Sequence, residues 1–387
     1  MSTKRLKELC YITHVNNIPS ILRRGILSHA QVAAEKIDYT RVYDEGIVQN
    51  RKSILTPGGK SLWEFANVYF QPRNPMLYRV KHEKSVDNIV VLAVKADILN
   101  RSDIFISTGN AANYATEILL REEGMKRLPE MKKYINKTWW TEEMGTKRKI
   151  MAECLVPDQI PPEMIQSVYV ANHTVAETVK QHIGRRKLSI IPEPNMFFLP
   201  SRQIRLTPNL SIVEGDMFFS GMQTLTISVN TVGVMGKGLA SRAKYQFPDA
   251  YVVYQDVCRN KILKMGKPYL YKRESSFDYQ LADQPSSLSH INRETWFLLF
   301  PTKRHWREKS DIQGIEHGLQ WIRDNYKQEG ITSLAVPALG CGLGQLKWKD
   351  VGPLMCRYLN LDIPIRIHLP LEEKLPQNLL SREFLIK

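Results

Sequence analysis

The chain has 387 residues, of which 43% are hydrophobic and 24% are charged. This length fits two domains of ordinary size, and the composition excludes a disordered chain. No stretch approaches the roughly 18 uninterrupted apolar residues of a membrane helix, and the N-terminus lacks the apolar region of a secretory signal, so we expect a cytoplasmic protein without a membrane partner. The formal net charge of +15 favours a polyanionic partner such as nucleic acid, with a solubilising excess of lysine as an equal alternative.

The N-terminal half contains weakly periodic elements. Residues 18–27 predict a short helix that ends at a glycine, and residues 88–99 and 167–171 predict strands. Residues 118–146 predict charged helix and loop. We therefore expect a mixed α+β domain in this half.

A change of composition marks the domain boundary. Four prolines break regular structure between residues 188 and 210, and two arginines keep this stretch solvated. We expect the last strand of the first domain here, followed by a short linker. The predicted domains cover residues 1–200 and 206–387.

Strands and helices alternate regularly after this linker. Such alternation describes an α/β sheet that binds its ligand at the carboxyl ends of the strands. The predicted strands cover residues 210–216, 224–230, 296–302 and 333–339. The predicted helices cover residues 239–247, up to Pro248, and 315–330.

Two glycine-rich loops follow predicted strands in this half. Glycine lets backbone N–H groups approach phosphate oxygens closely, and a following helix N-terminus adds a favourable potential. Neither loop matches a P-loop or a dinucleotide fingerprint, and either one alone is more often an ordinary tight turn. Together with Asp216 and Asn230, which end the first two strands, they predict a site for a diphosphate nucleotide. The loop glycines are Gly233, Gly236 and Gly238 in the first loop and Gly340, Gly342 and Gly344 in the second.

Lys303 directly follows the predicted strand 296–302 and adjoins His305 and Trp306. A lysine amine that burial or neighbouring cations have freed of its proton attacks the anomeric carbon of a ribose or acts as a base. An isolated lysine is more often an ordinary surface residue. The position after a buried strand favours a catalytic role.

Residues 206–380 resemble the macrodomain family, most closely its DNA-directed DarG branch. The segments VNTVGVMGKGLA, FPTKRHWR and PALGCGLGQLKW carry the resemblance. It implies an α/β/α three-layer fold that binds ADP-ribose and removes it from DNA. By resemblance, Asp216 would hold the adenine amine and Asn230 would face the distal ribose with the first loop. The second loop would wrap the diphosphate, and Lys303 would be catalytic.

One position departs from the pattern of related enzymes. Lysine-dependent glycohydrolases that act on proteins carry an aspartate where this chain has Gly344. We therefore expect hydrolysis to rest on Lys303 and bound water. A domain that only reads ADP-ribose is the alternative for this half.

Several polar residues of the N-terminal half are candidates for a site. His14 and Asn17 lie just before the first predicted helix, where they offer hydrogen bonds to a ligand or cap the helix. Glu153 lies in the apolar run MAECLV, where a carboxylate needs a structural partner or serves a site. Basic and aromatic residues precede it, which suits single-stranded DNA as well as a solvated helix with core tryptophans. They are Lys132, Lys133, Trp139, Trp140, Lys147, Arg148 and Lys149.

Residues 8–200 resemble the DarT family of DNA ADP-ribosyltransferase toxins. The segments ITHVNNIPSILRRGIL, NVYFQPRNPMLYRV and KIMAECLV carry this resemblance. It implies a split-sheet α+β ADP-ribosyltransferase fold that uses NAD⁺ to modify a base of single-stranded DNA, with thymine as the leading candidate. Glu153 would be the catalytic glutamate, and His14 and Asn17 would bind NAD⁺. Arg51 would assist the target base, with Lys52 as the alternative register.

Because the two halves are joined in one chain, we expect a natural toxin–antitoxin fusion whose macrodomain acts on ADP-ribosylated DNA. The chain ends soon after the macrodomain segments, so we expect control by hydrolysis and no separate blocking region. Two alternatives stay open at this point: a module that binds ADP-ribose without chemistry, and a transferase directed at protein. The cysteines are odd in number, without a C-x-x-C pair or a Cys/His cluster, so we expect reduced thiols and no metal.

Overall fold

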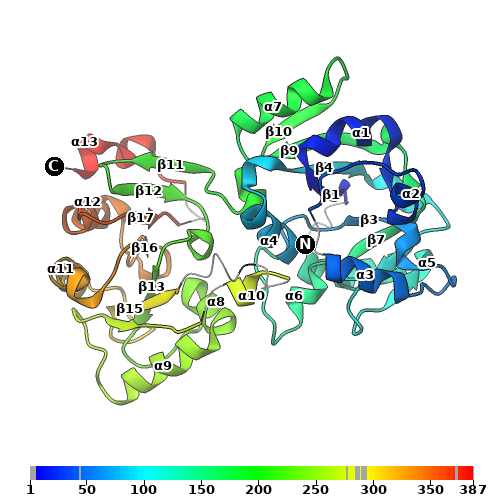
Figure 1. The fold of residues 1–387 in the computed structure, drawn as a ribbon. Coiled ribbons are helices and arrows are strands. Elements are labelled where there is room, and N and C mark those ends of the chain that lie inside the picture. Colours follow the sequence, from blue (N-terminus) through cyan, green and yellow to red (C-terminus); the bar gives the residue numbers. More distant parts are fainter. Residues whose placement is uncertain are drawn as a thin grey trace. The chain divides into compact units, whose positions relative to one another are not determined.

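Figure 1 shows the chain as a computed structural model, which describes all residues except 1–5, 43–44, 276–277, 284–287, 289–293, 371–373 and 387. The chain forms two compact units. Unit 1 comprises Met1–Phe198 together with Asp278–Ile291, and unit 2 comprises Leu199–Phe277 together with Asn292–Lys387. The contribution of Asp278–Ile291 to unit 1 is not foreseen from the sequence, because this segment lies inside the sequence of the second half.

Unit 1 is built on one eight-stranded sheet in the order β10-β9-β4-β1-β3-β7-β5-β6. Only β10 and β9 are parallel neighbours. Strands β1 and β3 meet only at Cys10 and Tyr69, whereas β1 pairs along its whole length with β4. The sheet is therefore split between β1 and β3, as expected from the sequence. The strands are β1 (Glu8–His14), β3 (Phe65–Tyr69), β4 (Ile89–Lys95), β5 (Phe105–Ser107), β6 (Ile118–Leu120), β7 (Glu153–Pro157), β9 (Ile165–Val170) and β10 (Ser189–Pro192).

Helices surround this sheet, and the chain also forms a small antiparallel two-stranded sheet from β2 (Ile26–Leu27) and β8 (Gln159–Ile160). The first helix ends as predicted, because Gly25 adopts a φ of 89° that favours glycine. The charged stretch after residue 118 begins with edge strand β6 and only then becomes helical. The helices are α1 (Ile18–Arg24), α2 (His29–Ala34), α3 (Glu45–Ser53), α4 (Pro75–Glu83), α5 (Arg121–Ile135), α6 (Thr146–Lys149), α7 (His173–Ile183) and α10 (Asp278–Leu281).

Unit 2 is built on a seven-stranded sheet in the order β11-β12-β17-β16-β13-β15-β14. Its five central strands are parallel, so their carboxyl ends share one edge. The stretch expected to be a linker contributes the edge strand β11. The strands are β11 (Arg202–Arg205), β12 (Leu210–Glu214), β13 (Thr224–Asn230), β14 (Tyr269–Tyr271), β15 (Trp296–Lys303), β16 (Leu334–Pro337) and β17 (Ile365–His368).

Both faces of this sheet are covered, which makes three layers (Figure 1). Leu298 and Phe300 of β15 pack into the core that α11 and α12 share. Phe297 points to the opposite face, where its ring centre lies 4.9 Å from that of Phe247, between α8 and α9. The helices are α8 (Gly238–Gln246), α9 (Pro248–Arg259), α11 (Ile312–Glu329), α12 (Trp348–Leu359) and α13 (Arg382–Leu385).

None of the described helices is long and apolar enough to cross a membrane. In the same part of the chain, no group of three or more His, Cys, Asp or Glu residues is placed to hold a metal ion. The five cysteines carry free thiols: Cys10, Cys154, Cys258, Cys341 and Cys356.

Candidate active sites

Glu153 is the first residue of β7, and its side chain is fully buried. Its Oε2 accepts a hydrogen bond from Arg51 Nη2 at 3.0 Å. Its Oε1 accepts a hydrogen bond from the backbone N–H of Ala111, also at 3.0 Å. The structure therefore brings two sequence-predicted residues into direct contact and leaves both carboxylate oxygens occupied.

Arg51 lies in the last turn of α3 and is held as a cation. Burial alone would lower the pKa of its guanidinium, but the Glu153 carboxylate and its hydrogen bond raise the pKa above its usual value. Neighbouring Lys52 points elsewhere, since its Nζ lies 4.4 Å from the ring centre of Trp63. Of the two registers left open by the sequence, the geometry favours Arg51.

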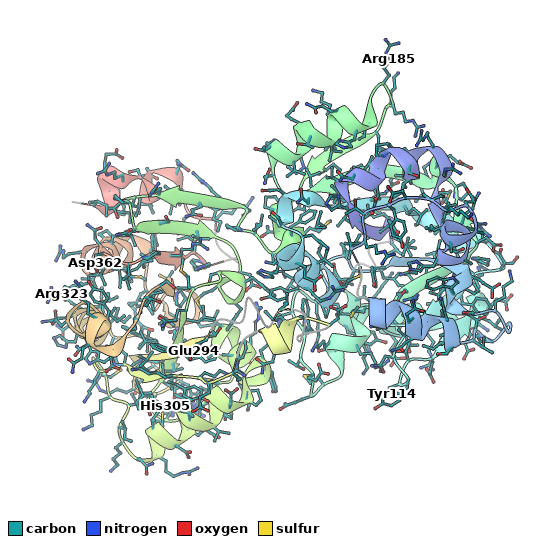
Figure 2. The ribbon with its side chains drawn as sticks, in the orientation of Figure 1. Tyr114, Arg185, Glu294, His305, Arg323 and Asp362 are labelled. Atoms are coloured by element: carbon teal, nitrogen blue, oxygen red, sulfur yellow. The ribbon has the colours of Figure 1, made fainter. Side chains whose placement is uncertain are left out.

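Two further groups at this site are not predicted from the sequence. Tyr69 ends β3 opposite Glu153 in the antiparallel pair and is buried. Ala111 belongs to the loop between β5 and β6, which also carries the fully exposed Tyr114 (Figure 2). A backbone N–H leaves no side-chain signal in a sequence, so only the fold reveals that this loop caps the carboxylate.

His14 and Asn17 lie at the end of β1 and just before α1. Burial lowers the pKa of His14, and its Nδ1 accepts a hydrogen bond from the Asn16 N–H at 3.2 Å. The Asn17 side-chain amide donates to Thr40 O and accepts from the Thr40 N–H, both at 2.8 Å. As placed, Asn17 anchors the segment around Thr40, and its Oδ1 keeps a second lone pair for a donor group of a ligand.

The basic and aromatic segment before Glu153 divides between core and surface. Trp140 is fully buried, so it belongs to the core, whereas Trp139 is partly exposed. Arg148 of α6 donates a hydrogen bond to Thr116 Oγ1 at 3.0 Å, which ties α6 to the loop that caps the Glu153 carboxylate. Arg148 is therefore a cation of this segment that contacts the loop beside the candidate catalytic residues.

The second site lies at the carboxyl ends of β13 and β15. Asn230 ends β13, and its partner in the parallel register is Lys303. Lys303 Nζ donates a hydrogen bond to Leu343 O in the second glycine loop at 3.2 Å. Gly238, at the start of α8, lies against the Leu343 side chain, so the two loops are neighbours. One sheet edge thus brings together Asn230, Lys303 and both glycine loops.

The carboxamide of Asn230 shapes the first loop. Its Nδ2 donates to Val234 O at 2.6 Å, and its Oδ1 accepts from Val232 N–H at 3.0 Å. Tyr254, from α9, donates a hydrogen bond to the same Oδ1 at 3.0 Å. Gly233, Gly236 and Gly238 lie along the turn from β13 into α8.

Partial burial lowers the pKa of Lys303, and the Glu308 carboxylate opposes this shift. A lowered pKa increases the fraction of neutral amine, which is the reactive form. Beyond Lys303, the centres of the His305 and Trp306 rings lie 5.2 Å apart, and His305 is half-buried. The environment of Lys303 is therefore compatible with the predicted nucleophile or base.

Asp216 follows β12 and is already paired. Its Oδ1 accepts a hydrogen bond from the Phe218 N–H at 3.1 Å, and its Oδ2 lies 2.7 Å from Arg242 Nη1 on α8. The Arg242 guanidinium also lies 4.4 Å from the centre of the Phe218 ring. The carboxylate expected to hold an adenine amine is thus partly neutralised by an arginine that the sequence does not single out.

His368 ends β17 near Asp216, and its Nδ1 hydrogen-bonds with Gly215 O at 3.0 Å. Burial lowers the pKa of His368 from 6.5 to about 4. The unfolded chain therefore binds an extra proton between these two pKa values, so stability falls as the pH drops through this window. We expect the protonation of His368 to lower the free energy of unfolding of the second domain by on the order of 3 kcal/mol between pH 7 and pH 4.

His368→Asn tests this expectation, since asparagine keeps a donor for Gly215 O and does not titrate. Urea unfolding of the full chain at a series of pH values should show a smaller acid loss for the variant than for the wild type. Identical pH slopes in the two chains would mean that His368 is not the titrating group.

Gly340 and Gly342 of the second loop both have positive φ, 72° and 63°. A Cβ at Gly340 would lie 2.6 Å from Leu346 Cδ1, whereas one at Gly342 would meet no atom within 4 Å. Because both positions share the backbone strain, the difference between their alanine variants isolates the packing. We expect Gly340→Ala to lower the free energy of unfolding by about 1–3 kcal/mol more than Gly342→Ala. Equal losses in urea unfolding would contradict the close packing.

Gly344 of the second loop packs closely against Ser310. A Cβ here would lie 2.4 Å from Ser310 Oγ, and the Ser310 N–H donates to Gly344 O at 3.0 Å. An aspartate, which is the residue expected here in related enzymes, would therefore need the Ser310 side chain to move.

The fold and the two sites define the class of the protein. A split sheet with a buried Arg–Glu pair is joined to an α/β/α domain with paired glycine loops. Residues 10–198 match the family described as ssDNA thymidine ADP-ribosyltransferase, DarT, and residues 292–355 match the Macro domain family. The chain is an ADP-ribosyltransferase domain followed by a macrodomain, so the fold prediction is confirmed.

Comparison over the full length identifies the family. The chain is 59% identical over 385 residues to the DNA ADP-ribosyl transferase–DNA ADP-ribosyl glycohydrolase fusion protein of Thermosipho africanus, which covers 99% of both chains. The solved structure of Thermosipho africanus DarTG in complex with ADP-ribose is 57% identical, with a TM-score of 0.93 over 98% of this chain and 100% of that one. A DNA ADP-ribosyl glycohydrolase of Mycobacterium tuberculosis is 35% identical over 138 residues, 36% of this chain and 35% of that protein.

The chain belongs to the family of DarT–DarG fusion proteins, which join a DNA ADP-ribosyl transferase to a DNA ADP-ribosyl glycohydrolase. This membership confirms the predicted toxin–antitoxin fusion and its two enzyme activities. It also excludes the alternative of a protein that binds ADP-ribose without catalysing a reaction.

Proposed function

We propose that unit 1 transfers ADP-ribose from NAD⁺ to a thymidine base of single-stranded DNA, and that unit 2 binds the ADP-ribosylated DNA and hydrolyses the link. The observation that carries the transfer is the buried contact between Arg51 and Glu153. The family description names single-stranded DNA and thymidine, and a relative binds ADP-ribose, which supports the choice of substrates.

Glu153 supplies negative charge where the reaction develops positive charge. As the bond to nicotinamide breaks, the anomeric carbon of the ribose becomes cationic, and a buried carboxylate stabilises it strongly because little water screens the interaction. In the free protein each Glu153 oxygen accepts one hydrogen bond, from Arg51 and from the Ala111 N–H. Each oxygen keeps a second lone pair, with which it would accept a hydrogen bond from a ribose hydroxyl of NAD⁺.

Arg51 then acts on the acceptor base. The new bond joins the anomeric carbon to a base nitrogen, which gives its proton to solvent water, and a neighbouring guanidinium stabilises the deprotonated nitrogen. The base must be unpaired for its pairing edge to react, which accounts for single-stranded DNA as substrate. The exposed ring of Tyr114 and the cations of α6 offer stacking and phosphate contacts next to this site.

In unit 2, Lys303 takes part in the hydrolysis that removes ADP-ribose from DNA. The backbone N–H groups of the two glycine loops would hold the diphosphate, and Asp216 and Asn230 would lie at the two ends of ADP-ribose. The neutral Lys303 amine attacks the anomeric carbon or takes a proton from the attacking water. In either case the bond to the base breaks, water is added to the ribose, and the base nitrogen regains its proton.

A label-and-chase experiment tests both halves with the wild-type chain. Two single-stranded oligonucleotides of equal length, one containing thymidine and one with deoxycytidine in its place, are incubated with labelled NAD⁺. We expect label only on the thymidine oligonucleotide, followed by its loss as free ADP-ribose once the NAD⁺ is removed. Label on protein and on neither oligonucleotide would overturn the proposal.

A further inference from the structure

A segment from the second half of the sequence is built into unit 1. Asp278–Ile291 lies between β14 and β15 along the chain, yet it clusters with unit 1. Its helix α10 contacts α4. Among the described residues of this segment, Leu281, Ala282 and Leu288 are buried. These three side chains therefore belong to the interior of unit 1.

Asp283 supplies a counter-ion to a buried arginine. Its Oδ1 accepts a hydrogen bond from Arg79 Nε at 2.7 Å, and the side chains of Asp283 and Arg79 are 5% and 1% exposed. Arg79 Nη1 also donates to Glu83 Oε2, one turn along α4, at 2.6 Å. A buried guanidinium needs such partners, because its lost hydration is otherwise uncompensated. Of the two carboxylates, only Glu83 comes from the N-terminal half.

Helix α4 connects this ion pair to the catalytic pair. Met76 and Arg79 are three residues apart and therefore share one side of α4. Tyr69 Oη donates a hydrogen bond to Met76 Sδ at 3.2 Å, and Tyr69 faces Glu153 across β3 and β7. Burial, and next the Glu153 carboxylate, raise the pKa of Tyr69 well above its usual value, and the charges of both ion pairs act on it. The phenol thus stands between the two buried pairs.

We infer that Asp283 is a positioning residue for ADP-ribose transfer, contributed by the macrodomain half of the sequence. The hydrogen bond to Asp283 fixes the position of Arg79, and Arg79 fixes the position of α4 against β3. The position of α4 in turn determines where the Tyr69 phenol lies relative to the Glu153 carboxylate. This inference rests on the proposed transfer reaction at Glu153. It implies that residues 1–198 lack part of the support of their own active site, so the fusion serves the transfer as well as its reversal.

Three variants of the full-length chain test this role. Asp283→Asn removes the charge at nearly constant size, Asp283→Glu keeps the charge, and Asp103→Asn breaks an exposed pair with Arg101 in the same unit. We expect Asp283→Asn to lower kcat for nicotinamide release by about 10- to 100-fold, with a smaller change in the KM for NAD⁺. Asp283→Glu should recover most of this loss, and Asp103→Asn should resemble the wild type.

The outcomes distinguish a positioning role of Asp283 from a loss of protein stability and from a failure of the proposed transfer reaction. A wild-type kcat for Asp283→Asn would overturn the inference, as would a loss that Asp283→Glu does not recover. If Asp283→Asn does not fold, Arg79→Lys replaces it, since lysine keeps the charge but loses the fork that joins Asp283 to Glu83. A folded Arg79→Lys chain with reduced kcat supports the inference, and an unchanged kcat contradicts it. Absence of DNA label from a Lys303→Ala chain with intact Asp283, in which hydrolysis cannot remove the label, would instead refute the proposed transfer.

Discussion

Glu153→Gln in the full-length chain should abolish the labelling of DNA from labelled NAD⁺, while the protein still folds and still strips ADP-ribose from modified DNA. Glutamine keeps the size and the hydrogen-bond acceptor for Arg51 or the Ala111 N–H. It carries no charge opposite the cationic ribose. Loss of a preorganised electrostatic group of this kind costs on the order of 10³ in rate. Nicotinamide release, measured in the presence and absence of DNA, is the readout.

Glu163→Gln is the matched control, because Glu163 is an exposed glutamate of the same unit. It should transfer ADP-ribose at the wild-type rate. Circular dichroism checks the fold of Glu153→Gln, since Arg51 loses its buried charge partner in that variant and breaking such a pair is destabilising. Transfer by Glu153→Gln within about tenfold of the control would show that Glu153 is not the electrostatic centre of the reaction.

The site residues that lie at the ends of strands could be predicted from the sequence. In unit 2 the parallel register puts Asn230 beside Lys303 at one sheet edge, as the alternation of strands and glycine loops indicates. In unit 1 the pattern around Glu153 marks a carboxylate in an apolar run, and the fold supplies Arg51 as its partner. A resemblance names these residues, and only the fold shows that they touch.

Other parts could not be predicted, for identifiable physical reasons. The bond from Ala111 to Glu153 comes from a backbone N–H, which any residue would supply. Trp139 and Trp140 are adjacent and chemically identical, so nothing in the sequence says that only the second is fully buried. Along the sequence, Asp283 lies between two strands of unit 2. A division of the chain into two continuous domains therefore places it in unit 2, although it belongs to unit 1.

Lys303→Ala in the full-length chain should convert a self-reversing enzyme into one that accumulates ADP-ribosylated DNA. Lys303 lies in unit 2, so the substitution leaves the Arg51–Glu153 pair intact while it removes the amine that donates a hydrogen bond to Leu343 O of the second loop. Modified DNA would then persist and block the growth of cells that express the variant. Label on an oligonucleotide after removal of NAD⁺, together with colony counts on induction, measures both effects.

Two further variants decide whether the neutral amine of Lys303 is what matters. Lys303→Arg keeps a cation that does not lose its proton, so it should be as inactive in hydrolysis as Lys303→Ala. Glu308→Gln keeps an oxygen for the His305 N–H but removes the charge that raises the pKa of Lys303. The pKa then falls further, more amine is neutral at pH 7, and the rise of the hydrolysis rate with pH shifts to lower pH. Normal growth with Lys303→Ala, or full hydrolysis by Lys303→Arg, would remove Lys303 from the chemistry and leave bound water with the Asn230 loop as the hydrolytic machinery.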